Sequence, residues 1–120
     1  MAWTTAAFKA RHKSVTRRNW DDGYAKSFQA GDVLAVYDKQ ARFGGKKIGT
    51  MCLTQKPYKE SEALMPDEDY EAEGFAYLDE HPEEKPKQWR NVNLHEKFED
   101  DRNWGEICWV IRFEILSVND

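Results

Sequence analysis

An alternation of apolar side chains near the end of the chain constrains the fold more than any other feature of the sequence. Successive side chains of a β-strand point to opposite faces, so apolar residues at every second position form one buried face. This pattern predicts a half-buried strand over residues 107–116, with Arg112 and Glu114 on its outer face. The alternating apolar residues are Ile107, Trp109, Ile111, Phe113 and Ile115.

More extended segments are predicted in the first half of the chain. The apolar run of residues 33–37 follows a Gly-Asp turn signal and has the length of a strand, and we expect it to be the central one. The glycine pair at residues 44–45 supplies a turn from which residues 48–54 return as an antiparallel partner. Residues 14–18 are expected to form a short extended piece.

Short helices are predicted between these strands. Thr4 or Thr5 is suited to cap a helix over residues 6–11, because a hydroxyl side chain accepts a hydrogen bond from a free backbone N–H. Acidic residues precede residues 70–73, as is typical of a helix N-terminus. Asn93 is expected to cap a further short helix that runs through Phe98.

Short helices interspersed among strands favour the α+β class, here a small, strongly curved sheet or β-barrel with short flanking helices. Pro82 and Pro86 indicate a loop over residues 79–88 rather than a linker between domains. A chain of 120 residues has the size of one domain and removes roughly two-thirds of its unfolded surface from water. We therefore expect a single domain over residues 1–120.

The composition and charge exclude some classes of protein. No apolar run is long enough to cross a bilayer and the first residues lack the layout of a signal peptide, so a cytoplasmic protein without membrane contact is expected. A net charge of −4 argues against coating of duplex nucleic acid by bulk electrostatics. The first 20 residues nevertheless hold no acidic side chain. They form either a local anion-attracting patch or a solvated basic stretch.

The cysteines and histidines show no metal-binding pattern. Cys52 and Cys108 both lie in apolar, strand-like segments, which is typical of reduced core thiols. His12, His81 and His95 are scattered, without the spacing that gathers zinc ligands. The sequence therefore predicts no metal and no cofactor.

Blocks of residues spread over most of the chain resemble the ASCH family. The order and the separation of the blocks match that family from about residue 4 to residue 116, and their ordered combination carries the resemblance. The blocks are Lys13-Ser14-Val15-Thr16-Arg17-Arg18, Trp20, Gly31-Asp32-Val33-Leu34-Ala35-Val36, Asp69, Glu73-Gly74-Phe75 and Trp109-Val110-Ile111-Arg112-Phe113-Glu114.

The resemblance implies a PUA-like β-barrel with a cleft in which Lys, Thr, Arg and Glu side chains converge. One bacterial branch of the family is a small amidohydrolase that removes the acyl group from N4-acetylcytidine with a Lys, a Thr three residues later and a distant Glu. Lys13, Thr16 and Glu73 fit these catalytic positions, and Arg18 fits the arginine of the K-x-x-T-x-R pattern. Other relatives are linked to RNA cleavage or RNA binding, so the resemblance leaves the activity open.

Simple chemistry gives the candidate catalytic residues their roles. Lys13 and Thr16 would point to opposite faces of a regular strand, so they meet only if the chain bends between them. Burial in a cleft would lower the pKa of Lys13 by as much as roughly 3 to 5 units, which would let it take a proton from Thr16, the nucleophile. Glu73 would orient the pair or pass the proton to the leaving amine, although its negative charge opposes the fall in the pKa of Lys13.

Three neighbouring residues are candidates for substrate binding. Arg18 would share the face of Thr16 and hold a phosphate or a base carbonyl with its planar donors. Arg17 would point the other way, towards solvent or over the core. Trp20 follows directly and is suited to stack on a base.

Three functions stay open at this point. The first is a nucleoside or nucleobase amidohydrolase. The second is a non-catalytic module that binds single-stranded or structured RNA, or a weak ribonuclease. The third is a protein-interaction domain in which the charged cluster only holds the fold together. A monomer is expected in each case, and the segment of residues 80–104, which departs from the amidohydrolase branch, puts the substrate in doubt.

Overall fold

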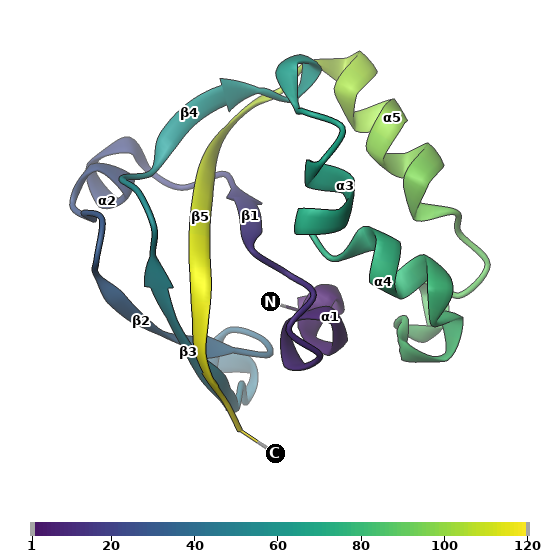
Figure 1. The fold of residues 1–120 in the computed structure, drawn as a ribbon, viewed down its shortest axis with the longest axis horizontal. Helices are drawn as coiled ribbons and strands as arrows, with labels where there is room; N and C mark the ends of the chain where they lie inside the picture. The colour runs from purple at the N-terminus through teal and green to yellow at the C-terminus, as the bar shows by residue number, and fades with distance from the viewer. Residues whose placement is uncertain (1, 120) are drawn as a thin grey trace.

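The computed structural model describes residues 2–119, which form an antiparallel five-stranded sheet with most of the helices at one side and α2 at the other (Figure 1). The longest strand, β5 (Ile107–Val118), is the common partner of three others. β1 (Val15–Arg18) and β4 (Tyr58–Ser61) pair with its first half on opposite edges, since Val110 is the register partner of a residue in each. β3 (Lys47–Leu53) pairs with the second half.

The position of β2 and the open edges of the sheet contradict two expectations. β2 (Val33–Tyr37) pairs with β3 at the edge of the β1-β5-β3-β2 path, so it is not the central strand. Only Val36 of this strand is buried, and Val33 is 61% exposed. The predicted barrel is also not formed in residues 2–119, because β1 and β2 each pair with a single strand and the sheet stays open. The α+β class is confirmed.

The helices are short except for the last one. In Figure 1, α3, α4 and α5 lie together beyond β1, with α1 beside them near the lower end of β5. The α-helices are α1 (Thr5–Lys9), α2 (Asp22–Lys26), α3 (Asp69–Ala72), α4 (Phe75–Glu80) and α5 (Leu94–Trp104). The 3₁₀ turns are η1 (Ala2–Thr4), η2 (Ala41–Phe43), η3 (Glu62–Leu64), η4 (Pro82–Glu84) and η5 (Lys87–Trp89).

Local sequence signals explain where α5 begins and ends. The side chain of Asn93 accepts hydrogen bonds from the backbone N–H groups of His95 and Glu96, which confirms the predicted N-cap. The helix continues past Phe98 to Trp104, and Gly105 ends it with a φ of 66°. The predicted loop over residues 79–88 contains the end of α4 and the turns η4 and η5.

Helix α1 separates two apolar cores. Phe8 is fully buried and packs in the core beneath the sheet with Trp109, Ile111 and Phe113. Its neighbour Ala7 packs in a second core. That core is formed by Ala7, Met65, Phe75, Leu78, Leu94 and Phe98. The space between the two cores is where the charged residues of β1 meet those of α3.

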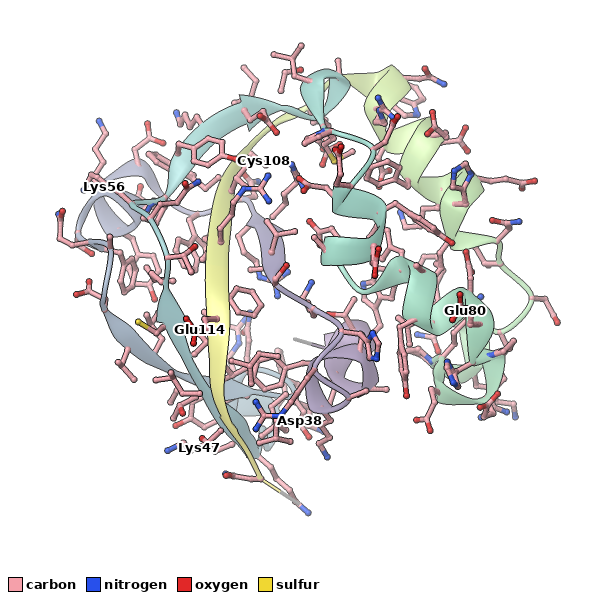
Figure 2. The ribbon with its side chains drawn as sticks, in the orientation of Figure 1. Asp38, Lys47, Lys56, Glu80, Cys108 and Glu114 are labelled. Carbon is pink, nitrogen blue, oxygen red and sulfur yellow. The ribbon has the colours of Figure 1, made fainter. Side chains whose placement is uncertain are left out.

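The two cysteines are free thiols at different depths. Cys52 is half-buried, whereas Cys108, labelled on β5 in Figure 2, is buried. Burial raises the pKa of Cys108 to about 11, which keeps the thiol protonated and unreactive near neutral pH. Within residues 2–119 no cluster of three or more His, Cys, Asp or Glu side chains is placed to hold a metal ion. None of the helices described there is long and apolar enough to cross a membrane.

Gly74 links α3 to α4 at a point where a side chain has no room. Its φ is 93°, and a Cβ atom there would lie 2.5 Å from the Cβ of Ala7. We expect Gly74→Ala to destabilise the fold by about 2–5 kcal/mol, since it combines left-handed strain with overpacking. Gly105→Ala is the matched control, because its φ of 66° is similar but no neighbour is closer than 3.6 Å. Urea unfolding measures both, and equal losses would contradict the close packing on α1.

Candidate functional site

A cavity of about 180 Å³ lies between η1, β1, η3, the start of α4 and α5, and we call it the inner cavity. It brings together Lys13, Thr16 and Glu73, although Glu73 is 60 residues from Lys13 in sequence. The lining residues are Trp3, Thr4, Lys13, Thr16, Arg17, Arg18, Glu62, Met65, Glu73, Phe75 and Asp101. Most of them are charged or polar, so the cavity is suited to a polar ligand.

Lys13 is held at the cavity wall by Glu73. Its ammonium group donates to the backbone oxygen of Glu73 at 2.9 Å and to the carboxylate Oε2 at 3.2 Å. Burial lowers the pKa of Lys13, the charge of Glu73 opposes that change, and the nearby arginines Arg18 and Arg17 lower the pKa further. Lys13 precedes the first residue of β1, and the left-handed conformation of Arg11, with φ 64°, turns the chain just before it.

Thr16 lies on β1 beside Lys13 and is 4% exposed. Among residues 2–119, its hydroxyl group makes no side-chain hydrogen bond. The hydroxyl oxygen is also not one of the fully buried polar atoms that lack a partner there, so part of its surface is accessible. A buried hydroxyl normally has a hydrogen-bond partner. The hydroxyl of Thr16 therefore faces the cavity and is available to a ligand.

Arg17 does not point to solvent, which corrects the prediction. Its side chain is 7% exposed and lies among three carboxylates. It donates to Glu73 Oε1 at 3.1 Å, to Glu60 Oε1 at 2.9 Å and to Asp69. Burial works against the guanidinium charge, but the hydrogen bonds to Asp69 and Glu60 outweigh it and raise the pKa of Arg17. The prediction failed because these carboxylates come from β4 and from the α3 region, 43 to 56 residues away in sequence.

Asp69 joins this cluster to β5 and was not predicted as a site residue. Its carboxylate, 2% exposed, accepts two parallel hydrogen bonds from Arg112 at 3.0 and 2.9 Å. Burial alone would raise the pKa of Asp69, but Arg112 and Arg17 lower it below its ordinary range. Asp69 at the start of α3 thus fixes that helix to both β1 and β5. Its acidic character was visible in the sequence, but its two arginine partners were not.

Arg18 lines the inner cavity and is the cation there that lacks a carboxylate partner. Its Nη1 atom donates to the backbone oxygen of Arg17 at 3.4 Å, and none of the salt bridges among residues 2–119 includes it. Burial lowers the pKa of Arg18, and the charge of Glu73 partly offsets this. The donors of Arg18 are therefore free to hold an oxygen atom of a ligand.

Trp20 lies away from the inner cavity. Its ring packs edge-on against Tyr24 at 4.9 Å and lies 5.3 Å from Phe28, beside the core of the sheet. Of these two candidate binding residues, Arg18 therefore lines the cavity, whereas Trp20 packs against the core of the sheet. Trp3 lines the cavity instead.

Two carboxylates at the cavity were also missed by the sequence analysis. Glu62 comes from η3 and Asp101 from α5, and both line the inner cavity together with Arg18, which carries the opposite charge. Burial raises the pKa of Glu62, with further contributions from Asp101 and Glu106. The segment of residues 60–101 is rich in acidic residues throughout, so no pattern singled these two out.

Comparisons with known proteins support the fold. No family model matches the chain, and no curated protein matches it significantly. Among solved structures, the crystal structure of protein EF3133 from Enterococcus faecalis, assigned to the family model DUF984, is similar with a TM-score of 0.59. The two chains are 11% identical, and the match covers 98% of this chain and 72% of the other. At that identity the likeness shows a shared fold and nothing of the activity.

Proposed function

We propose that the inner cavity binds the base of an N4-acylated cytidine and that Lys13, Thr16 and Glu73 hydrolyse its amide bond. The observation that carries this proposal is that the buried Lys13 lines the same cavity as Thr16, whose hydroxyl has no hydrogen-bond partner among residues 2–119. An amine whose pKa is lowered by burial is suited to accept a proton from a nearby hydroxyl.

The size of the cavity favours a single base. Its volume of about 180 Å³ is below the range of about 300–1,000 Å³ that is usual for drug-sized ligands. A pyrimidine ring with a small substituent fits that space, whereas a ribose would extend beyond it. The free donors of Arg18 are suited to bind a carbonyl oxygen of the base or of the acyl group.

The proposed reaction has two steps with balanced protons. Neutral Lys13 takes the proton of the Thr16 hydroxyl, the oxygen attacks the acyl carbon, and the bond to the exocyclic nitrogen breaks. Protonated Lys13 returns the proton to that nitrogen, which leaves as the amine of cytidine. Water then attacks the acyl carbon with Lys13 again as the base, the bond from that carbon to the Thr16 oxygen breaks, and Lys13 returns the proton to this oxygen as the carboxylic acid is released. Glu73 holds Lys13 in place throughout through two hydrogen bonds.

We infer further that the chain is a divergent ASCH domain with a PUA-like arrangement. Lys13, Thr16 and Arg18 of the K-x-x-T-x-R pattern line one cavity with Glu73, as the family resemblance implies. The open sheet departs from the expected barrel.

RNA binding is the weaker candidate, because Arg17 is occupied by Glu60, Asp69 and Glu73 and does not offer its charge to a phosphate. Glu62 and Asp101 at the cavity would also repel a phosphate backbone.

Thr16→Ala tests the proposed function. We expect the wild-type protein to release cytidine from N4-acetylcytidine, and the variant to lose this activity while keeping its affinity for the substrate within about tenfold, since the nucleophile contributes mainly to the transition state. Liquid chromatography measures turnover, and calorimetry measures binding. Thr54→Ala, which removes an exposed hydroxyl outside the cavity, is the matched control and should keep full activity.

Undiminished hydrolysis by Thr16→Ala would remove Thr16 from the mechanism. A wild-type protein that ignores N4-acetylcytidine but binds short RNA, with an affinity that falls when Arg18 is replaced, would favour the RNA-binding alternative instead.

A further inference from the structure

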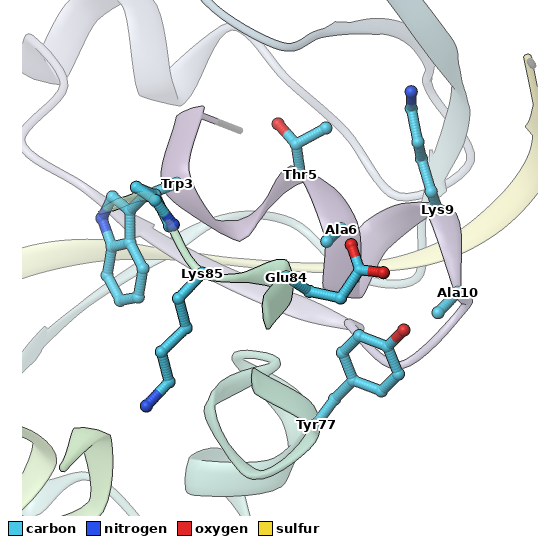
Figure 3. Close-up of a pocket in the computed structure, with 9 residues that line it drawn as sticks. Trp3, Thr5, Ala6, Lys9, Ala10, Tyr77, Glu84 and Lys85 are labelled. Atoms are coloured by element: carbon cyan, nitrogen blue, oxygen red, sulfur yellow. The ribbon is translucent and has the colours of Figure 1, made fainter. Parts of the chain in front are cut away.

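A second hollow lies next to the inner cavity, and the two share one wall. This outer groove has a volume of about 540 Å³ and lies between α1 and the α4–η4 segment (Figure 3). Its lining residues are Trp3, Thr5, Ala6, Lys9, Ala10, Tyr77, Glu84, Lys85 and Pro86. Of the residues described in 2–119, Trp3 is the one that lines both hollows. Trp3 therefore lies at the junction between the inner cavity and the larger groove.

The indole of Trp3 is held in a stack of aromatic rings. It lies 5.3 Å from Phe75 with an angle of 15° between the ring planes, and 5.6 Å from Trp89 with an angle of 25°. Phe75 is itself part of the inner cavity wall, whereas Trp89 lines neither hollow. Stacked pairs of this kind contribute about 0.5–1.5 kcal/mol each beyond burial, so the ring is a fixed wall.

The outer groove has room for an aromatic extension of a ligand, with Trp3 and Tyr77 among its lining residues beside the charged Lys9 and Glu84. In Figure 3, Trp3 lies at one side of the groove and Lys9 and Ala10 lie at the other, with Ala6 of α1 between them. The ammonium group of Lys85 is not available there, because it donates to Asp79 and to the backbone oxygen of Val92, both at 2.8 Å. Removing the indole of Trp3 would join this groove to the inner cavity.

We propose that Trp3 is a specificity-determining residue, which limits the inner cavity to bases that carry a small acyl group. The proposal rests on the proposed function, since it concerns the ligand of the same cavity. With the indole in place, an acetyl group fits, but a benzoyl group on the same nitrogen collides with the cavity wall. Without it, the larger group extends into the outer groove. One extra methylene group in a hydrophobic pocket changes the discrimination between two substrates by about 10- to 200-fold, and we take the lower end as the expected scale because the inner cavity is lined mostly by polar side chains.

The test compares the affinities of N4-acetylcytidine and N4-benzoylcytidine by calorimetry, in a Thr16→Ala background that prevents turnover. With Trp3 unchanged, we expect the affinity for N4-acetylcytidine to be at least about tenfold higher than that for N4-benzoylcytidine. Trp3→Ala should reverse the preference by at least about tenfold, and Trp3→Phe, which keeps an aromatic stack with a smaller ring, should give an intermediate ratio. Trp89→Ala is the matched control, because it breaks the stack on the other face and leaves the wall in place.

The ratio of the two affinities separates this proposal from a general loosening, which would weaken both compounds alike. An unchanged ratio in both Trp3 variants, or the same reversal in Trp89→Ala, would overturn the role of Trp3. Equal affinities for both compounds in the protein with Trp3 unchanged would overturn the role of Trp3 and leave the proposed function standing. Failure of the wild-type cavity to bind either compound would instead remove the proposed function, and this inference with it.

Discussion

Lys13→Met is expected to lower kcat/KM for N4-acetylcytidine by about 10²- to 10⁴-fold, the usual contribution of a general base. Methionine has a similar length and suits a site that is 3% exposed, so the fold should be kept. Glu73 would lose one partner but keep Arg17 at 3.1 Å. Lys26→Met is the control, since Lys26 is exposed and far from both hollows. Activity of Lys13→Met within threefold of the wild type would exclude Lys13 as the base.

In the proposed mechanism, the same lysine determines the pH dependence of the reaction. The reactive form is the neutral amine, and burial lowers the pKa of Lys13 below its ordinary value of 10.5. The fraction of neutral amine therefore grows as the pH rises through the lowered pKa. We expect kcat/KM of the wild type to rise with pH and to level off before pH 10.5. The rising limb should be missing from any residual activity of Lys13→Met.

Asp69→Asn is expected to destabilise the protein by about 3–5 kcal/mol, because it leaves the buried Arg17 and the half-buried Arg112 without their shared counter-charge. Asp69 accepts two hydrogen bonds from Arg112 and a further one from Arg17, and it is 2% exposed. Urea unfolding near pH 7 measures the loss. Asp67→Asn is the matched control in the same segment, since the side chain of Asp67 is 88% exposed and its ion pair with Arg102 should contribute about 0–1 kcal/mol.

The effect of Asp69 should fade in acid. Arg112 and Arg17 hold the pKa of Asp69 below its ordinary value of 3.8, so the folded protein binds this proton less readily than the unfolded chain. The contribution of ionised Asp69 to the free energy of unfolding is therefore complete at a pH above the ordinary pKa. It is lost as the pH falls through the lowered pKa of the folded protein. The stability gap between the wild type and Asp69→Asn should therefore narrow below about pH 4. A gap that stays constant with pH would contradict the ionic role of Asp69.

The strands were predictable where the pattern is local. The alternation at residues 107–116 located β5, because two-residue periodicity is a property of the strand itself. Its neighbours were not predictable in the same way. The apolar run of β2 has the composition of a central strand but lies at an edge, and Ile107 is 66% exposed where the sheet ends at Ser61. Both depend on which segments pair, and that information is spread over the whole chain.

The candidate site divides in the same way. The spacing of Lys13, Thr16 and Arg18 is local, and the resemblance to a family placed Glu73 near them. The burial of Arg17 could not be predicted from a basic stretch, because its three carboxylate partners are supplied by distant segments. Trp3 was equally hidden, since its role follows from the shape of two hollows on either side of one ring.

The position of β5 in the chain affects when the protein can fold. β1, β3 and β4 all depend on β5 for their hydrogen bonds, yet β5 is the last of them to be synthesised. Until residue 118 has left the ribosome, the earlier strands share only the β2–β3 hairpin. Pairing over such long sequence separations is slow, and the exposed segments must stay unassociated in the meantime. Arg17 of β1 and Asp69 of α3 therefore come together only when the sheet has formed on its final strand.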